Sequence, residues 1–247
     1  MIGLGGGLEL GGRSFHYSLS PANTANVRPH EIFPAPLIWL GGELYPAAMT
    51  DVPFVRDLGI EAAYAVAVGV DATSSDGRTF GTSWNRLLVG LRYRIRTSDA
   101  EGSMIGLGLG YGRSAFAVEP EDEAATNIAG EVATVDYEYL RLAGDLRIPI
   151  GSVSLLADVA WLAVVSAGEV YERFTPANRG TKGDASIGGV QLAAGLGVEL
   201  TAGVELTAVF DYYRFFYAFS PEPGDQYVAG GALDQIFGIR FGVQYAY

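Results

Sequence analysis

The stretch Ile105–Gly112, which reads IGLGLGYG, decides the class of fold. Its odd positions carry Ile, Leu, Leu and Tyr, and its even positions carry only glycine. Side chains on a β-strand point alternately to opposite faces, so a period of two predicts a strand with two unlike faces. One face of this strand is apolar and the other has almost no side chains.

The same period recurs along the whole chain of 247 residues. Most of the alternating segments hold 9 or more residues. Strands of soluble proteins usually hold about 5–6 residues, whereas a tilted strand needs about 9–11 to cross a bilayer. We therefore predict an all-β fold: a single closed antiparallel transmembrane β-barrel of ten strands that forms one domain over residues 1–247, with eight or twelve strands as alternatives. The predicted strands lie near residues 2–17, 38–45, 58–70, 86–95, 105–114, 140–148, 153–161, 190–200, 205–212 and 237–247.

The composition of the two faces indicates which one meets lipid. The polar face consists mostly of Gly, Ala and Ser with sparse charges, and the only lysine, Lys182, falls in a predicted loop. A face in contact with water would carry many more charged residues. In a membrane barrel the apolar face meets lipid and the polar face lines the lumen, and we favour this interpretation over a soluble barrel or sandwich.

The connections alternate in length. Long polar links are predicted near residues 20–34, 71–80, 119–132, 167–185 and 219–231, and shorter ones near 96–102, 150–152 and 201–203, with an intermediate link at 46–57. This alternation is typical of outer-membrane barrels. With ten strands, both termini lie on the side of the short turns. The apolar phase of the first strand shifts near Gly11–Gly12, which predicts a β-bulge after which Phe15 and Tyr17 face lipid.

Composition excludes several other classes of protein. The longest stretches without a charged residue, such as Ala185–Val198, hold 14 residues, whereas a membrane-spanning helix needs about 20 apolar ones. The chain has no cysteine and two histidines, which excludes thiolate and multi-histidine metal sites, and no cofactor is predicted. A net charge of −12 argues against nucleic acid as a partner.

Charged residues on the predicted lumen face include both signs, six basic and eight acidic. An unpaired charge in a confined interior is costly, so these groups are expected to pair and to close the lumen. A narrow charge-lined pore is the alternative. The predicted lumen residues are Glu9, Glu43, Glu61, Arg86, Arg92, Arg94, Arg141, Asp145, Arg147, Asp158, Glu199, Glu205, Asp211 and Arg240.

The last eight residues read RFGVQYAY. This segment resembles the C-terminal strand motif of bacterial outer-membrane β-barrels, with Arg240, Gly242, Tyr245 and Tyr247 at the defining positions. The resemblance implies a bacterial outer-membrane location with periplasmic termini and contact with outer-membrane lipid and lipopolysaccharide. It also implies insertion by the barrel assembly machinery and a mature chain that has lost its signal peptide.

Enzymes also occur on such barrels. Omptin proteases require an Asp-His pair that faces two Asp, and neither His16 nor His30 lies in an Asp-x-His context. The segment Phe15–Ser18 resembles the His-x-Ser pair of outer-membrane lipid A deacylases, with Glu31 as the orienting acid. If Phe15 and Tyr17 face lipid, His16 and Ser18 face the lumen near its outer rim.

We conclude from the sequence that the protein is a non-enzymatic envelope anchor or docking protein with a polar, largely occluded lumen. An envelope protein is a possible partner. The two alternatives are a narrow small-solute channel and a lipid A deacylase-type hydrolase that uses His16, Ser18 and Glu31.

Overall fold

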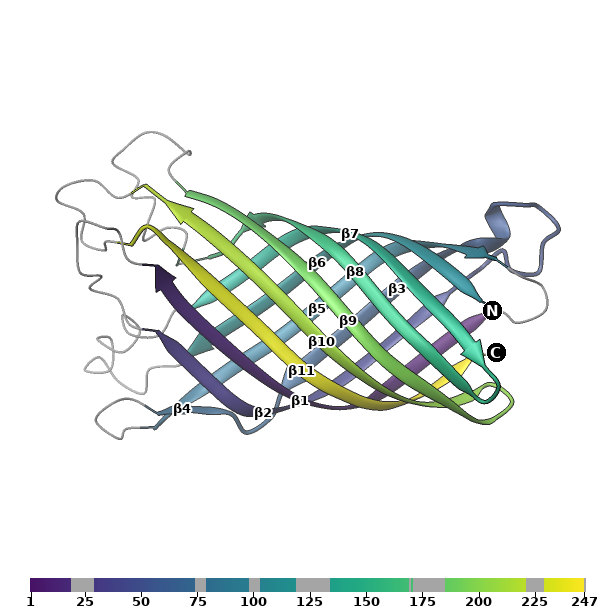
Figure 1. The fold of residues 1–247 in the computed structure, drawn as a ribbon, viewed down its shortest axis with the longest axis horizontal. Coiled ribbons are helices and arrows are strands. Elements are labelled where there is room, and N and C mark those ends of the chain that lie inside the picture. The colour runs from purple at the N-terminus through teal and green to yellow at the C-terminus, as the bar shows by residue number, and fades with distance from the viewer. Residues whose placement is uncertain are drawn as a thin grey trace.

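The computed structural model describes residues 1–18, 29–73, 79–97, 103–118, 134–168, 170, 185–220 and 229–246. Within these residues, long antiparallel strands form one closed barrel (Figure 1). No helix in this part of the chain has the length and apolarity needed to cross a membrane. The barrel strands are β1 (Ile2–Ser18), β2 (His30–Leu44), β3 (Leu58–Ala67), β5 (Thr79–Arg96), β6 (Met104–Val118), β7 (Val135–Ile150), β8 (Val153–Ser166), β9 (Ala185–Thr201), β10 (Val204–Phe219) and β11 (Gly231–Ala246).

Each of these strands pairs with its neighbours in the chain, and β1 pairs with β11 to close the barrel. The short β4 (Asp71–Thr73) follows β3 and pairs with β5 beyond the point where β3 ends. The predicted ten-strand closed antiparallel barrel is therefore confirmed. The strands hold 10 to 18 residues, long enough to cross a bilayer at a tilt.

Both termini lie at the same end of the barrel as the short turns (Figure 1). We call this the termini end and the opposite end the loop end. At the termini end β7 connects to β8 through Gly151 and Ser152, and β9 connects to β10 through Ala202 and Gly203. Gly151 has φ 62° and Gly203 has φ 81°. Such tight hairpin turns need positive φ, which glycine adopts without steric cost.

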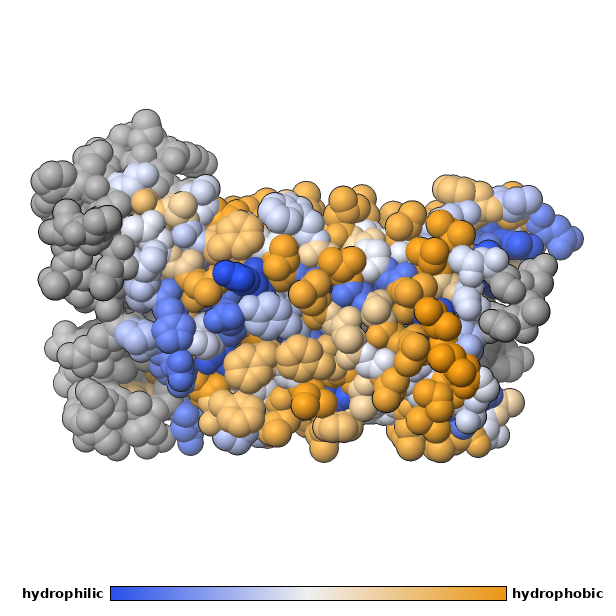
Figure 2. Space-filling model, in the orientation of Figure 1, coloured by the Kyte–Doolittle hydropathy of each residue, from blue (hydrophilic) through white to orange (hydrophobic). Residues whose placement is uncertain are grey.

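The outer wall carries an apolar band over the middle and the termini end of the barrel (Figure 2). Leu8 is 66% exposed and Leu142 is 64% exposed, whereas lumen-facing residues of the same strands, such as Glu9 and Arg141, are buried. The apolar faces of the strands thus point outward, as the sequence predicts for a membrane barrel. Residues of the band include Leu8, Leu40, Leu91, Leu109, Leu142, Trp161, Leu196, Phe210 and Phe241.

The predicted phase shift in β1 is wrong. The odd-numbered residues of β1 from Gly3 to Tyr17 all point inward, and Phe15 is fully buried. The irregularity lies in β2 instead, where the register against β1 shifts between Gly11 and Arg13 and the extra residue falls in Phe33–Pro34. Proline has no N–H to give to a ladder, so a bulge accommodates it. What changes along β1 is the chemistry of the lumen, not the direction of the side chains.

The loop end of the barrel reverses the distribution of polarity. Its outer wall is polar, and Figure 2 shows hydrophilic side chains between the apolar band and the residues drawn in grey. Its interior is instead filled by buried aromatic and aliphatic side chains. This part is built like a water-soluble barrel, with the apolar face inside. The outward polar residues are Ser14, His16, Glu31, Asn85, Arg113, Asp136, Glu138, Arg214 and Gln235.

A charge placed in the apolar band should be costly only there. Leu142→Arg should lower the free energy of unfolding by about 2–4 kcal/mol, because a lipid-facing arginine near the bilayer midplane is destabilising. Asn85→Arg, on the outward polar wall, should have almost no effect. Urea titration of the protein folded into phospholipid vesicles measures both. Equal effects of the two substitutions would contradict the assignment of the band.

Candidate functional site

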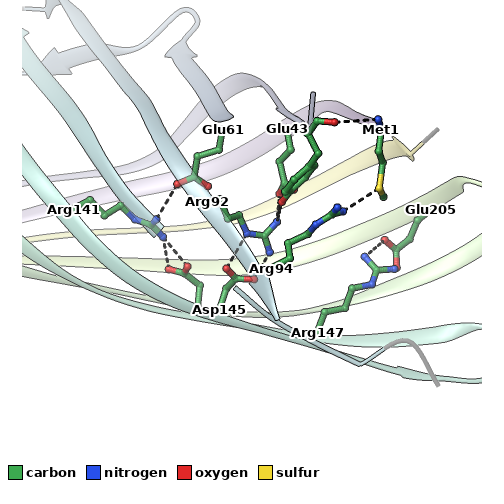
Figure 3. A network of polar contacts seen from close by, with 11 residues as sticks. Met1, Glu43, Glu61, Arg92, Arg94, Arg141, Asp145, Arg147 and Glu205 are labelled. Atoms are coloured by element: carbon green, nitrogen blue, oxygen red, sulfur yellow. Dashed lines mark hydrogen bonds and ion pairs between the residues drawn. The ribbon is translucent and has the colours of Figure 1, made fainter. Parts of the chain in front are cut away.

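The candidate functional site is the lumen, in which side chains from distant strands meet. Arg92 on β5 binds Glu43 on β2 and Asp145 on β7, and its Nε lies 3.0 Å from Asp145 Oδ2 (Figure 3). Around the barrel, β2 and β7 are separated by three strands. The guanidinium therefore bridges two walls of the bore, and the fork of an arginine suits this because it can bind two carboxylates at once.

Arg141 on β7 makes a second bridge. Its Nη2 lies 2.7 Å from Asp158 Oδ2, its Nε donates to Gln191 Oε1 at 2.9 Å, and its Nη1 lies 3.6 Å from Glu61 Oε1 on β3. Arg141 is 6% exposed and Gln191 is 8% exposed. Four strands are thus tied together at this level of the lumen.

Further ion pairs lie on either side of these bridges. Towards the loop end, Arg86 on β5 binds Glu9 on β1. At the same side of the bridges, Arg240 Nε lies 2.7 Å from Asp211 Oδ2. Towards the termini end, Arg147 on β7 binds both carboxylate oxygens of Glu205 on β10 at 2.9 Å.

A different set of groups lies at the mouth of the lumen at the termini end. The ring of Tyr45 is buried, and the guanidinium carbon of Arg94 lies 3.4 Å from its centroid. Arg94 also contacts Met1 Sδ at 3.0 Å and Asp57 Oδ1 at 3.6 Å. Burial, followed by the charge of Glu43, raises the pKa of the Tyr45 hydroxyl above its usual range. The hydroxyl therefore stays protonated and donates to Glu43 Oε2 at 2.8 Å.

Glu199 stands apart from the other predicted lumen residues. The structure brings the remaining thirteen into ion pairs, whereas Glu199 is exposed at the termini end and has no ion pair among the described residues. It pairs in register with Glu205, whose carboxylate is already bound by Arg147. Three further residues of the lumen contacts, Asp57, Tyr45 and Gln191, are not predicted from the sequence, because Asp57 lies in a predicted link between strands and the other two carry no charge.

Glycine makes room for these bridges. A Cβ atom at Gly106 would collide with the carboxylate of Asp145, and one at Gly197 would collide with that of Glu205. At Gly242 it would collide with the indole of Trp39. Long side chains of neighbouring strands therefore pack directly against the glycine backbone on the inner face of the barrel. This explains physically why charged residues and glycines share one face.

The loop end of the lumen is filled by an aromatic plug, which we define as Phe15, Trp84, Phe116, Tyr137, Phe215 and Tyr217 with their buried neighbours. Tyr137 on β7 stacks on Phe215 on β10 with ring centroids 3.8 Å apart. These rings come from β1, β5, β6, β7 and β10, so they converge from around the whole wall. The sequence predicts a polar lumen throughout, and this part of the prediction is wrong for the loop end.

A fully buried network of polar side chains lies within the aromatic plug. Arg13 on β1 binds Asp234 on β11, with Nη2 2.9 Å from Oδ2, and both side chains are 0% exposed. Tyr137 donates to Asp234 Oδ2 at 2.7 Å, and Tyr217 donates to the Tyr137 hydroxyl at 2.6 Å. The guanidinium carbon of Arg13 lies 4.3 Å from the ring centroid of Phe116. Each charge is thus satisfied inside an apolar core, which is the condition under which a buried pair is tolerated.

A cavity of about 200 Å³ lies in the middle of the lumen, with lining residues that include Glu9, Trp39, Arg86, Tyr139 and Asp211. Three buried atoms of these residues, Glu9 Oε1, Trp39 Nε1 and Arg86 Nε, have no hydrogen-bond partner within the described part of the chain. A polar cavity of this size has room for several water molecules. The residues of the cavity belong partly to the ion-paired region and partly to the base of the aromatic plug.

The structure also corrects the placement of the residues named for the hydrolase alternative. His16 and Ser18 point outward on β1 and not into the lumen, because Phe15 and Tyr17 occupy the inward positions. His16 contacts Ser14, with Nε2 2.6 Å from Oγ, and the same Nε2 lies 3.1 Å from Glu31 Oε1. A relay needs the serine and the carboxylate on different ring nitrogens, and here both contact one. The cluster lies on the exposed outer wall.

The residues of the predicted assembly motif divide between the two faces of β11. Arg240 and Gly242 point inward, the former to Asp211 and the latter under Trp39. Tyr245 points outward and is 47% exposed. Tyr247 lies outside the described residues. In the part of the chain that the structure covers, no group of three or more His, Cys, Asp or Glu residues could hold a metal ion.

Comparison with known proteins supports the fold. The sequence matches no protein-family model and no curated protein. The structure is similar to that of the outer-membrane protease OmpT from Escherichia coli, with a TM-score of 0.54 and 10% identity over 100% of this chain and 96% of that one. Weaker matches are a TodX monoaromatic hydrocarbon channel variant, with a TM-score of 0.33 and 8% identity, and a Pseudomonas aeruginosa FadL homologue, with a TM-score of 0.32 and 10% identity. Each of these two matches covers 99% of this chain and 89% of the other. The similarity to OmpT, at a TM-score of 0.54, shows that the protein has an outer-membrane β-barrel fold.

The buried pair in the plug yields a test. Asp234→Leu removes the carboxylate that binds Arg13 in an apolar core and should cost about 3–5 kcal/mol of unfolding free energy. The double variant Arg13→Met/Asp234→Leu should recover most of that loss. Asp136→Leu, which breaks the exposed pair with Arg113, should cost less than about 1 kcal/mol. Urea unfolding of each variant in vesicles gives these values, and a double variant as unstable as Asp234→Leu would contradict the account.

Proposed function

We propose that the protein is a non-conducting, non-enzymatic anchor of the bacterial outer membrane. The observation that carries this proposal is the sequence of contacts across the bore. Arg92 links β2 to β7, Arg141 links β3 to β9, and Tyr137 links β7 to β11. Each contact joins walls that are several strands apart. Bonded side chains that cross the bore at successive levels support a lumen that is closed to solutes.

The membrane location is supported by the outer wall. Its apolar band would be exposed to water in a soluble protein, at a cost of about 1.5–3 kcal/mol for each large side chain. The polar outer wall of the loop end supports a barrel that extends beyond the bilayer on that side. In this arrangement the termini lie in the periplasm and the long links face outward. Outer-membrane lipid and lipopolysaccharide are the proposed lipid partners of the band.

The last strand supports insertion by the barrel assembly machinery. Its lipid-facing side consists of four residues whose side chains are 44–56% exposed: Ile239, Phe241, Val243 and Tyr245. Inside the barrel, Arg240 is held by Asp211 and stacks above Trp39 at 5.2 Å. An envelope protein that docks on the loops or on the turn between β2 and β3 is the proposed further partner.

The channel alternative is tested by conductance. The wild-type protein should be electrically silent in planar bilayers, because both the ion-paired region and the aromatic plug close the bore. The triple variant Tyr137→Ala/Phe215→Ala/Arg92→Ala truncates side chains both in the aromatic plug and in the ion-paired region. It should show discrete openings and so demonstrate that the barrel was inserted. Reproducible single-channel steps from the wild-type protein would refute the anchor and support the narrow channel.

The hydrolase alternative is tested by lipid analysis. OmpT is a protease, but an identity of 10% extends only the fold to this chain. Because His16 contacts Ser14 and Glu31 through one nitrogen, cells that produce the protein should have lipid A of unchanged mass. Loss of an acyl chain in those cells, reversed by His16→Ala but not by Asn85→Ala elsewhere on the polar wall, would establish a lipid hydrolase instead.

A further inference from the structure

The turn between β2 and β3 differs from the two-residue turns at the same end of the barrel. It spans residues 45–57, contains the short helix η1 (Val55–Asp57), and projects at the termini end (Figure 1). Four of its apolar side chains are exposed: Met49 by 89%, Val52 by 54%, Phe54 by 62% and Val55 by 44%. We call these four residues the apolar foot. An exposed apolar cluster of this kind indicates a surface that something covers.

The turn is fixed to the barrel at both ends. At its start, Tyr45 is buried and its N–H donates to the Met1 carbonyl at 3.0 Å. At its end, Asp57 is 7% exposed and lies 3.6 Å from both Arg94 and Arg96. The apolar foot is therefore held at a defined height beside the barrel wall, because neither end of the turn can move without breaking these contacts.

The backbone at Phe54 directs its ring onto the barrel. Phe54 has φ 74° and ψ −54°, and the Val55 N–H donates to the Pro53 carbonyl at 2.9 Å, which together form a γ-turn. This conformation is unfavourable for a residue with a side chain and persists only where the surroundings hold it. The ring of Phe54 packs against Tyr93, with centroids 4.8 Å apart.

Tyr93 connects the apolar foot to the lipid-facing band. It lies on the outward face of β5 between Leu91 and Ile95, which are 52% and 40% exposed. Phe54, through its contact with Tyr93, thus extends the apolar surface of the barrel wall beyond the end of the strands. Aromatic side chains at this level are typical of the boundary between acyl chains and headgroups.

Basic side chains border the apolar foot. Arg56 and Arg96 are 52% and 56% exposed along their side chains, and together with Arg94 they share one carboxylate, that of Asp57. With the exposed Asp51 included, this end of the turn carries three positive and two negative charges. An apolar surface with excess positive charge at its edge matches a bilayer surface that carries phosphate groups.

We propose that the turn is an interfacial foot that binds the phospholipid leaflet at the termini end. Phe54 and Val52 enter the boundary between headgroups and acyl chains, and Arg56 and Arg96 lie at the phosphates. This inference rests on the proposed membrane location of the barrel. It adds a second mode of attachment, beside the spanning strands, that fixes the depth of the barrel in the bilayer.

Quenching of an introduced indole by brominated lipid tests this proposal. Phe54→Trp is prepared in a Trp161→Phe background, so that the remaining tryptophans, Trp39 and Trp84, are buried in the lumen. The wild-type protein supplies the reference, because Trp161 is 52% exposed within the apolar band. Ser152→Trp, in the polar turn between β7 and β8 at the same end, is the matched control.

In vesicles of brominated phospholipid, the indole introduced by Phe54→Trp should lose fluorescence about as strongly as Trp161, and that introduced by Ser152→Trp should lose much less. Quenching of the Phe54→Trp protein no stronger than the control overturns the foot, since water or a protein partner then covers this surface. If Trp161 itself is not quenched, the membrane location fails as well, so the two failures are distinguishable.

The charge requirement has its own readout. Quenching of the Phe54→Trp protein should be stronger in brominated phosphatidylglycerol than in brominated phosphatidylcholine. Adding Arg56→Gln and Arg96→Gln should remove that difference while leaving the quenching of Trp161 in the otherwise wild-type protein unchanged. If quenching is equal in the two lipids, both for the Phe54→Trp protein and for the same protein with Arg56→Gln and Arg96→Gln, the role assigned to the two arginines is overturned.

Discussion

The bore of a ten-strand barrel is narrow enough for side chains from opposite walls to touch, and the whole interior is arranged around that distance. Arginine has the length and the fork to reach carboxylates on two other strands, as Arg92 does with Glu43 and Asp145. Glycine on the neighbouring strands keeps the path of each bridge free. Because every charge inside a confined space must be satisfied, the same bridges that satisfy these charges tie distant strands of the wall together.

A second constraint acts along the axis of the barrel. Where the outer wall is apolar, the interior holds ion pairs, and where the outer wall becomes polar, the interior holds the aromatic plug. The same strands serve both segments without changing the direction of their side chains, as β1 shows between Glu9 and Phe15. A closed barrel allows this because every strand is paired through backbone hydrogen bonds on both sides, and this pairing does not depend on which face of the strand is apolar.

The sequence predicts the barrel well because alternation is a direct consequence of strand geometry. Thirteen of the fourteen charged residues that it assigns to the lumen form ion pairs in the structure, and Glu199 does not. The prediction fails where an apolar residue points inward, as with Phe15 and Tyr17, because apolarity alone cannot distinguish lipid from an aromatic core. The partners of each charge, and contacts such as Asp57 with Arg94, depend on which strands face each other across the bore. One sequence does not give that register.

The central claim is that the environment of the outer wall changes from lipid to water along a single strand. The chain has no cysteine, so spin labels can be placed one at a time at outward positions of β1, and their collisions with oxygen and with a water-soluble nickel complex can be compared in vesicles. The account predicts labels at Leu4, Leu8 and Leu10 that oxygen reaches preferentially, and a label at His16 that the nickel complex reaches preferentially. The same preference at all four positions would contradict it.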